Sequence, residues 1–168
     1  CVEKKDHILY TNIKEYYENI PTKIITGLEW IYYNTLYSHI YKVDDDFFAL
    51  NINNSEEIYN YDYYGNYIIK KLIRTYHFNK CNDKELNKSE YDGKFIYNYA
   101  SGGYGYILSR KAIFILLQNK NYICKEMYED KAIGDVLYTN NIIINSTNYY
   151  KLNYKIPNIT KKSNIISD

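Results

Sequence analysis

Three consecutive aspartates, Asp44 to Asp46, stand in the segment HIYKVDDDFFALN between two apolar stretches. Adjacent carboxylates repel one another and are costly to remove from water, so the triplet predicts a cationic partner. Asp44 and Asp46 point to the same side of an extended backbone, and such a pair can hold a hard divalent cation such as Mn²⁺ or Mg²⁺. A solvated acidic turn is the alternative, but the apolar flanks favour a metal site.

Three of the seven glycines lie close together in YASGGYGYILS, residues 99 to 109. Glycine allows a sharp backbone turn or the close approach of a ligand, so the cluster predicts either a ligand-binding loop or a plain tight turn. The segment lacks the Lys and Ser/Thr of a P-loop and does not match GxGxxG. The glycines alone therefore do not indicate a nucleotide site.

A second acidic pair, Glu129 and Asp130, opens a segment with helical periodicity. A carboxylate at a helix N-terminus stays ionised and can accept a proton, which makes either residue a candidate general base. Acids are also common in the first turn of helices for structural reasons alone. The histidines, His7, His39 and His77, share no spacing and are interpreted as structural.

The residues before the aspartate triplet predict the order strand, helix, strand. Residues 7–13 alternate in polarity, and PTKIITGLEWIYYNTL begins with Pro21 at a favourable first helical position. The expected inner face of this helix consists of Ile24, Ile25, Leu28 and Ile31. A strand over 38–43 would place the triplet at its carboxyl end, the edge at which ligands collect in open α/β sheets.

The middle of the chain predicts antiparallel strands and a surface loop. One or two antiparallel strands are expected around Gly65, and residues 81–94 have the composition of a polar loop. Residues 104–108 predict a further strand. Ser109 is the expected N-cap of a helix that ends at about Gln118.

The last regular elements are a helix that begins at Glu129 and a strand from about Ile142. The helix is expected to bury Ile133, Val136 and Leu137. From Lys151 the chain is expected to be irregular, and we assign residues 155–168 to an irregular tail.

At 168 residues the chain fits one domain, residues 1–168. Its formal charge of +1 argues against a broad nucleic-acid footprint, because such binders neutralise many phosphates with clustered Lys and Arg. The 24 tyrosines are typical of an AT-rich genome rather than of a functional code. The three cysteines lie far apart without ligand spacing, which argues against a zinc site and allows at most one disulfide.

The ends of the chain predict a processed protein or a piece of a longer one. The first residue is Cys1 and the single methionine is Met127. No run approaches the roughly 18 to 20 apolar residues that span a bilayer. Any membrane attachment is therefore expected through a segment that this sequence does not contain.

Three segments in order, YKVDDDFFALN, YNYASGGYGYILSRKA and YEDKAIGDVLYTNNI, resemble the β-1,3-galactosyltransferase and Fringe-like family, glycosyltransferase family 31. That family shows an aspartate triplet after a strand, a block similar to Y-x-SGG-x-x-Y-x-LSR, and an ED-x-x-x-G block. The upstream segment IKEYYENIPTKIITGLEWIYYN is similar to the family's tyrosine-containing turn and following helix. The resemblance covers about residues 7 to 145.

The resemblance implies a GT-A fold, an α/β architecture with a Rossmann-like mixed sheet flanked by helices. Relatives usually have further strands before the triplet that hold the uridine, whereas 43 residues precede Asp44 here. A fragment, a divergent miniature and a domain whose donor pocket is completed elsewhere all remain open. Relatives also commonly provide a late histidine as a metal ligand, and no histidine follows His77 in this sequence.

The resemblance also implies roles for the three motifs. Asp46 would be the direct metal ligand with Asp44 as a second, and Asp44 and Asp45 would position the ribose and the waters of the metal. The implied lining of the sugar or acceptor pocket is Ser101, Gly102 and Gly103. Asp130 would be the catalytic base, with Glu129 as the second candidate.

The implied activity is the metal-dependent transfer of a hexose from a UDP-sugar, with inversion, to a hydroxyl of a glycan or glycoprotein. The hexose would be galactose, N-acetylglucosamine or glucose, the linkage β-1,3, and the metal Mn²⁺ or Mg²⁺. A GT-A transferase with another nucleotide-sugar donor, a non-catalytic glycan- or nucleotide-binding module and a purely structural domain are the alternatives. The resemblance implies the Golgi or secretory lumen for a eukaryotic protein and the cytoplasm for a viral or bacterial one.

Overall fold

The computed structural model describes residues 2–5, 8–45, 56–65, 68–69, 75–94 and 97–146. Its strands are β1 (Val2–Lys5), β2 (Ile8–Thr11), β3 (His39–Lys42), β4 (Tyr63–Gly65), β5 (Ile68–Ile69), β6 (Tyr99–Ala100) and β7 (Tyr106–Ser109). Its α-helices are α1 (Ile20–Asn34), α2 (Arg110–Gln118), α3 (Lys120–Ile123) and α4 (Glu129–Thr139), and its 3₁₀ helices are η1 (Tyr17–Asn19) and η2 (Glu56–Asn60). This order of elements confirms the expected mixed α/β class.

The strands of the described residues form three small sheets. β1 and β2 pair as an antiparallel hairpin, and β5 pairs with β6. The third sheet has the order β3-β7-β4, with β7 antiparallel to both neighbours. A single parallel bridge joins Tyr64 to Asn145. The order β2, α1, β3 confirms the expected order strand, helix, strand, and within the described residues β2 pairs with β1 whereas β3 pairs with β7. The larger Rossmann-like sheet stays a prediction.

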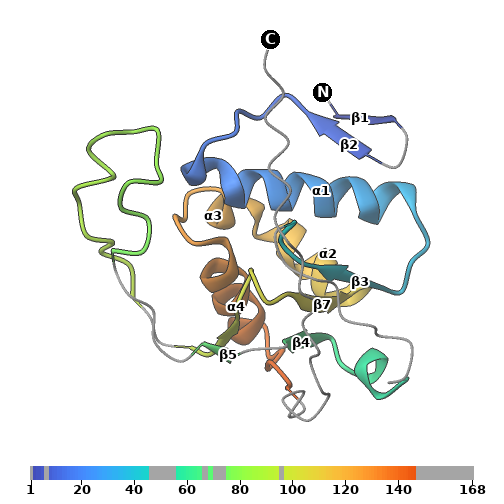
Figure 1. Cartoon of the computed structure of the whole chain (residues 1–168). Helices are drawn as coiled ribbons and strands as arrows, with labels where there is room; N and C mark the ends of the chain where they lie inside the picture. Colours follow the sequence, from blue (N-terminus) through green and yellow to red (C-terminus); the bar gives the residue numbers. More distant parts are fainter. Residues whose placement is uncertain are drawn as a thin grey trace, which may run out of the picture.

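The core lies on one face of the β3-β7-β4 sheet, beneath the helices. Successive side chains of a strand point to opposite faces, so Tyr106 and Leu108 enter the main core with residues of α1, α2 and α4. Ile107 points the other way and packs with Ile58 and Tyr64. In Figure 1 α1 (blue) lies across α2 and α3, which both pack against it. None of the helices in the described ranges has the length and apolar character needed to cross a bilayer.

Helix α1 begins as expected, with Pro21 in its first turn, and buries Ile25 and Leu28. Its last turn is tied to α2 by Arg110. The Arg110 guanidinium donates to the carbonyls of Tyr32 and Thr35 and lies 4.4 Å from the centre of the Tyr32 ring. A cation at a helix C-terminus satisfies orphan carbonyls and opposes the negative end of the helix dipole. This contact holds the C-terminus of α1 against the start of α2.

Ser109 is the N-cap of α2, which confirms the prediction. Its Oγ accepts the N–H of Ala112 at 3.1 Å, and the helix ends at Gln118. The same hydroxyl donates to Asp62 Oδ1 at 2.6 Å, so the cap also joins α2 to the residue before β4. The junction of strand and helix is thereby held at a fixed angle.

The predicted strand from Ile142 is reduced to one bridge at Asn145. The reason is the way α4 ends. Asn141 adopts a left-handed φ of 61°, and the N–H of Ile142 returns to the carbonyl of Leu137 at 2.9 Å. This Schellman motif, with its αL residue and its six-to-one hydrogen bond, uses residues 140–142 to end the helix. The run of isoleucines is therefore too short to pair as a strand.

Other sequence expectations agree with the described residues. Strands β4 and β5 lie on either side of residues 66–67, and each pairs antiparallel to another strand. Residues 81–94 contain turns and bends without helix or strand. Residues 147–168, which include the predicted irregular tail over residues 155–168, lie outside the described residues, as do His7 and Cys1.

Candidate active site

A cleft of about 850 Å³ opens between the end of β3, the turn over residues 101–105 and the N-terminus of α4. Every predicted site residue that the structure describes lines it. These residues are Asp44, Asp45, Ser101, Gly102, Gly103, Glu129 and Asp130. Asp46, the predicted direct metal ligand, lies outside the described residues. The three motifs thus meet in one cleft although up to 86 positions separate Asp44 from Asp130 in the sequence.

The pairing of β3 with β7 brings the first two motifs together. Lys42 lies opposite Tyr106 in this ladder, so Asp44, two residues beyond Lys42, falls beside the turn that precedes β7. That turn is shaped by Gly105, which has a φ of +84°. A Cβ at Gly105 would lie 2.8 Å from the carbonyl oxygen of Lys42. Glycine is therefore required here both for its conformation and for the close approach to β3.

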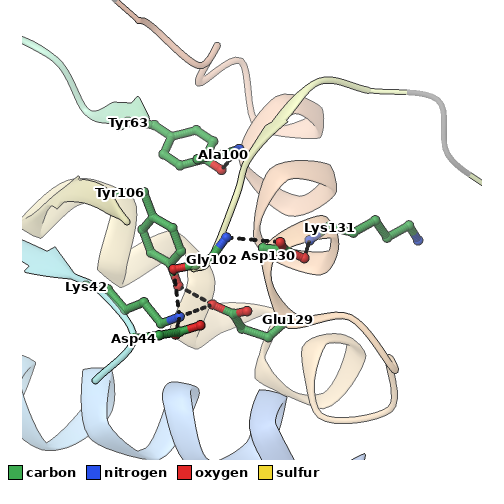
Figure 2. A network of polar contacts seen from close by, with 9 residues as sticks. All are labelled: Lys42, Asp44, Tyr63, Ala100, Gly102, Tyr106, Glu129, Asp130 and Lys131. Atoms are coloured by element: carbon green, nitrogen blue, oxygen red, sulfur yellow. Dashed lines mark hydrogen bonds and ion pairs between the residues drawn. The ribbon is translucent and has the colours of Figure 1, made fainter. Parts of the chain in front are cut away.

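Lys42 lies at the centre of the polar network, as Figure 2 shows. Its Nζ donates to Asp44 Oδ1 at 2.6 Å and to the carbonyl oxygen of Gly102 at 3.2 Å, and it lies 3.4 Å from Glu129 Oε1. The Lys42 side chain is 11% exposed. Burial lowers its pKa, but the carboxylates of Glu129 and Asp44 outweigh burial and leave the pKa above its usual value. Lys42 therefore stays protonated and supplies a cationic partner to Asp44 and Glu129.

Glu129 is buried and has two partners. Its Oε1 accepts the phenolic hydrogen of Tyr106 at 2.6 Å in addition to facing Lys42. Burial and the negative charge of Glu129 together raise the pKa of Tyr106 well above its usual value, so the phenol keeps its proton and remains a donor. Glu129 is thus fixed between a phenol and an ammonium group.

Asp130 lies on the cleft wall and is held by backbone amides. Its Oδ2 accepts the N–H of Gly102 at 3.0 Å, and its Oδ1 accepts the N–H of Lys131 at 2.8 Å. Burial, followed by the neighbouring charge of Glu129, raises the pKa of Asp130 to about 7, against the opposing effect of the two amides and of Lys42. A carboxylate with a pKa near 7 can both accept and release a proton at neutral pH.

The wall near Asp130 is aromatic, which the sequence did not indicate because tyrosine is abundant throughout the chain. Tyr17, Tyr76 and Tyr128 line the cleft there. The Nζ of Lys80 lies 3.4 Å from the centre of the Tyr76 ring and 5.6 Å from that of Tyr17. Rings of this kind can stack on the apolar face of a sugar or base, and a lysine beside them favours an anionic ligand.

His77 supports this wall from behind. It is 1% exposed, its Nδ1 lies 2.6 Å from the hydroxyl of Tyr128, and its Nε2 lies 2.9 Å from the carbonyl oxygen of Ser89. Both ring nitrogens are engaged within the protein, in agreement with the interpretation of His77 as structural.

Among the described residues the cysteines are Cys81 and Cys124, and both are free thiols.

Lys42 and Tyr106 are the functional candidates that sequence reasoning missed. Lys42 precedes Asp44 by two positions, and this spacing places both side chains on one side of a strand. That signal was available in the sequence. The role of Tyr106 had no comparable signal, because it depends on β7 lying next to the N-terminus of α4.

The chemistry of the donor set fits a hard divalent cation, since Asp44 and Asp45 offer carboxylate oxygens to the cleft. One oxygen of Asp44 is already 2.6 Å from the Lys42 ammonium. Among the residues that the structure describes, no group of three His, Cys, Asp or Glu side chains is arranged to hold a metal ion. Asp46, the predicted direct ligand, lies outside these residues, so the metal stays a prediction.

Comparison with known proteins identifies the family of this chain. The family model described as Galactosyltransferase matches residues 2–148, which include the aspartate triplet, the glycine turn and the Glu129-Asp130 pair. No curated protein matches the chain significantly. Because the family model covers most of the chain, this protein belongs to the galactosyltransferase family.

Proposed function

We propose that this protein is a glycosyltransferase that moves a hexose from a UDP-sugar to a hydroxyl of a glycan or glycoprotein acceptor, with inversion and most simply in β-1,3 linkage. Family membership supports glycosyltransferase activity in general. The observation that carries the finer proposal is Asp130, a carboxylate on the cleft wall whose pKa is raised to about 7.

Asp130 is the group that accepts the proton in this proposal. The acceptor hydroxyl loses its proton to Asp130 as its oxygen attacks the anomeric carbon, and a single displacement inverts that carbon. General base catalysis is typically worth about 10² to 10⁴ in rate. The amides of Gly102 and Lys131 hold the carboxylate in place without neutralising it.

The donor's diphosphate is assigned to the side of the cleft that carries Asp44 and Asp45. A divalent cation bound by the triplet would stabilise the charge that develops on the leaving diphosphate. The chain's own residues contribute shape and charge there: Lys42 offsets the carboxylates, and Gly103 leaves its Cα without a side chain beside Asp44.

The test is a panel of nucleotide-sugars, incubated with and without Mn²⁺ and assayed for transfer to oligosaccharides and for slow hydrolysis. We expect one UDP-hexose to be consumed in a Mn²⁺-dependent manner, and Asp130→Asn to consume it about 10² to 10⁴ times more slowly while still binding UDP. Asp92→Asn removes an exposed acid that does not line the cleft and serves as the matched control. Binding of UDP without turnover of any donor would instead favour the non-catalytic module.

A further inference from the structure

Lys42 joins three segments of the cleft that are distant in sequence. Its ammonium contacts Asp44 on the same strand, the carbonyl of Gly102 in the glycine turn, and Glu129 at the start of α4. The contacts measure 2.6, 3.2 and 3.4 Å, and the side chain is 11% exposed. Two of these contacts are hydrogen bonds and the third is an ion pair, so the protein already surrounds the ammonium group with oxygen atoms.

The contacts of Lys42 distinguish the two acids of the pair. Glu129 faces Lys42 and Tyr106 and is held in place as an ion-paired, hydrogen-bonded carboxylate. Asp130 has no side-chain cation within hydrogen-bond distance in the described part of the chain, and it receives two backbone amides instead. Two adjacent carboxylates thus have different roles because one cation lies against only one of them.

Gly102 connects Lys42 with Asp130. Its carbonyl accepts from Lys42, and its own N–H donates to Asp130. A Cβ at Gly102 would lie 2.9 Å from Glu129 Oε2 and 3.2 Å from Lys42 Nζ, so the backbone itself packs against the ion pair. The carbonyl and the N–H of Gly102 belong to two peptide planes that meet at its Cα, so Lys42 binds one plane and Asp130 the other.

We propose that Lys42 is a positioning residue of the transfer reaction: it locks Glu129 as a fixed structural anion and, through Gly102, orients Asp130 as the group that accepts the acceptor's proton. The inference rests on the proposed function, because it describes how that same cleft selects its base. It differs from a role in donor binding, in which the ammonium would leave these contacts to hold the diphosphate.

The decisive variants are Lys42→Met, Glu129→Gln and the double variant, measured as full chains with the donor found in the panel. If Lys42 acts by positioning, Lys42→Met lowers kcat by about 10- to 100-fold and changes the donor KM by less than about threefold. The double variant is expected to fall no more than about threefold below the worse single variant, because both changes break the same contact.

The pH dependence of kcat distinguishes a positioning role of Lys42 from a purely structural one, because loss of a structural contact alone would not change the apparent pKa. The positive charge of Lys42 lowers the pKa of Asp130 and the negative charge of Glu129 raises it. The midpoint pH of the acid limb of the kcat profile should therefore be higher in Lys42→Met and lower in Glu129→Gln than in the wild type. In the double variant it should return close to the wild-type value. Lys42→Arg keeps the charge and should keep the limb in place even where kcat falls.

Two controls make the outcome decisive. Lys120→Met removes a lysine that pairs with Glu29 at 2.8 Å outside the cleft and should leave all parameters unchanged. Lys42→Met leaves Glu129 buried without its cation, so if it does not fold, Lys42→Arg and the double variant carry the test.

The inference is overturned if Lys42→Met keeps its kcat, or if its main effect is a higher donor KM with an equal loss of UDP affinity in a titration that does not depend on turnover. A wild-type protein that consumes no nucleotide-sugar overturns the proposed function as well. If the wild type is active and Lys42→Met has the same kcat, only the inference is overturned.

Discussion

The hydroxyl of Tyr106 donates to Glu129 Oε1 at 2.6 Å, so the middle strand of the β3-β7-β4 sheet is bonded directly to the first residue of α4. Both residues are buried. The contact fixes the N-terminus of α4 against the sheet and, with it, the position of Asp130 in the cleft.

Replacement of Tyr106 by Phe should destabilise the protein measurably. The change deletes one hydrogen bond to a buried carboxylate, and bonds to charged groups are worth about 1.5–3 kcal/mol. Urea unfolding should report a loss of this size. Tyr37→Phe alters a tyrosine that is 67% exposed and should stay within about 0.5 kcal/mol of the wild type. Equal midpoints for the two variants would argue against the contact.

The rate of transfer should depend on the protonation of Asp130. With a pKa of about 7, Asp130 is protonated in acid and cannot accept a proton, so kcat should rise with pH and level off above neutrality. Asp130→Asn should have a kcat about 10² to 10⁴ times lower than the wild type, and this kcat should no longer rise with pH. A limb that persists in a residually active Asp130→Asn protein would assign the titration to another group.

The same group makes folding stability depend on pH. In the folded state Asp130 has a pKa of about 7, above the value of 3.8 for an unperturbed aspartate, so the folded state binds the extra proton between these values. The contribution of Asp130 to the free energy of unfolding therefore falls as pH rises from about 4 to about 7 and is constant above.

Asp130→Asn lacks this dependence, so its stability relative to the wild type should increase between pH 5 and pH 8. About two pH units of this interval lie below the folded-state pKa of about 7, so the ceiling is about 3 kcal/mol, since each unit is worth about 1.4 kcal/mol. Thermal unfolding at the two pH values measures the difference. Parallel pH dependence in the two proteins would place the pKa of Asp130 near that of an ordinary aspartate.

Two helical glycines should respond to alanine in opposite directions. Gly27 in α1 has open space around its Cα, with no atom within 4 Å of an added Cβ, so Gly27→Ala should stabilise by about 0.5–1 kcal/mol. In α4 a Cβ at Gly134 would lie 2.3 Å from the Cβ of Tyr99 and 3.2 Å from its Cα. Gly134→Ala should force α4 away from β6 and cost about 1–3 kcal/mol or more.

Denaturation curves of the two glycine variants, recorded together, check the prediction. The expected result is a higher midpoint for Gly27→Ala and a lower one for Gly134→Ala. A stabilising effect at Gly134 would mean that α4 does not pack against β6 as closely as the structure indicates.

Local structure was the part that sequence could predict. The helix of Pro21, the cap formed by Ser109 and the helix opened by Glu129 were all expected, because capping and periodicity are properties of a few neighbouring residues. The expected strand at Ile142 was wrong because the αL cap at Asn141 ends α4 within the same residues. A propensity for strand was outweighed by a helix terminus that needed its own hydrogen bonds.

By itself the sequence determined which residue types could do chemistry: the aspartate triplet, the glycine turn and the Glu129-Asp130 pair, in the order typical of one family. Only the tertiary structure decided which role each of these groups has. The antiparallel pairing of β3 with β7 brings Lys42 and Tyr106 against Glu129 and leaves Asp130 to the cleft. The physical reason is that a charge acts over a few ångströms of space, and sequence separation does not reveal which charges become neighbours.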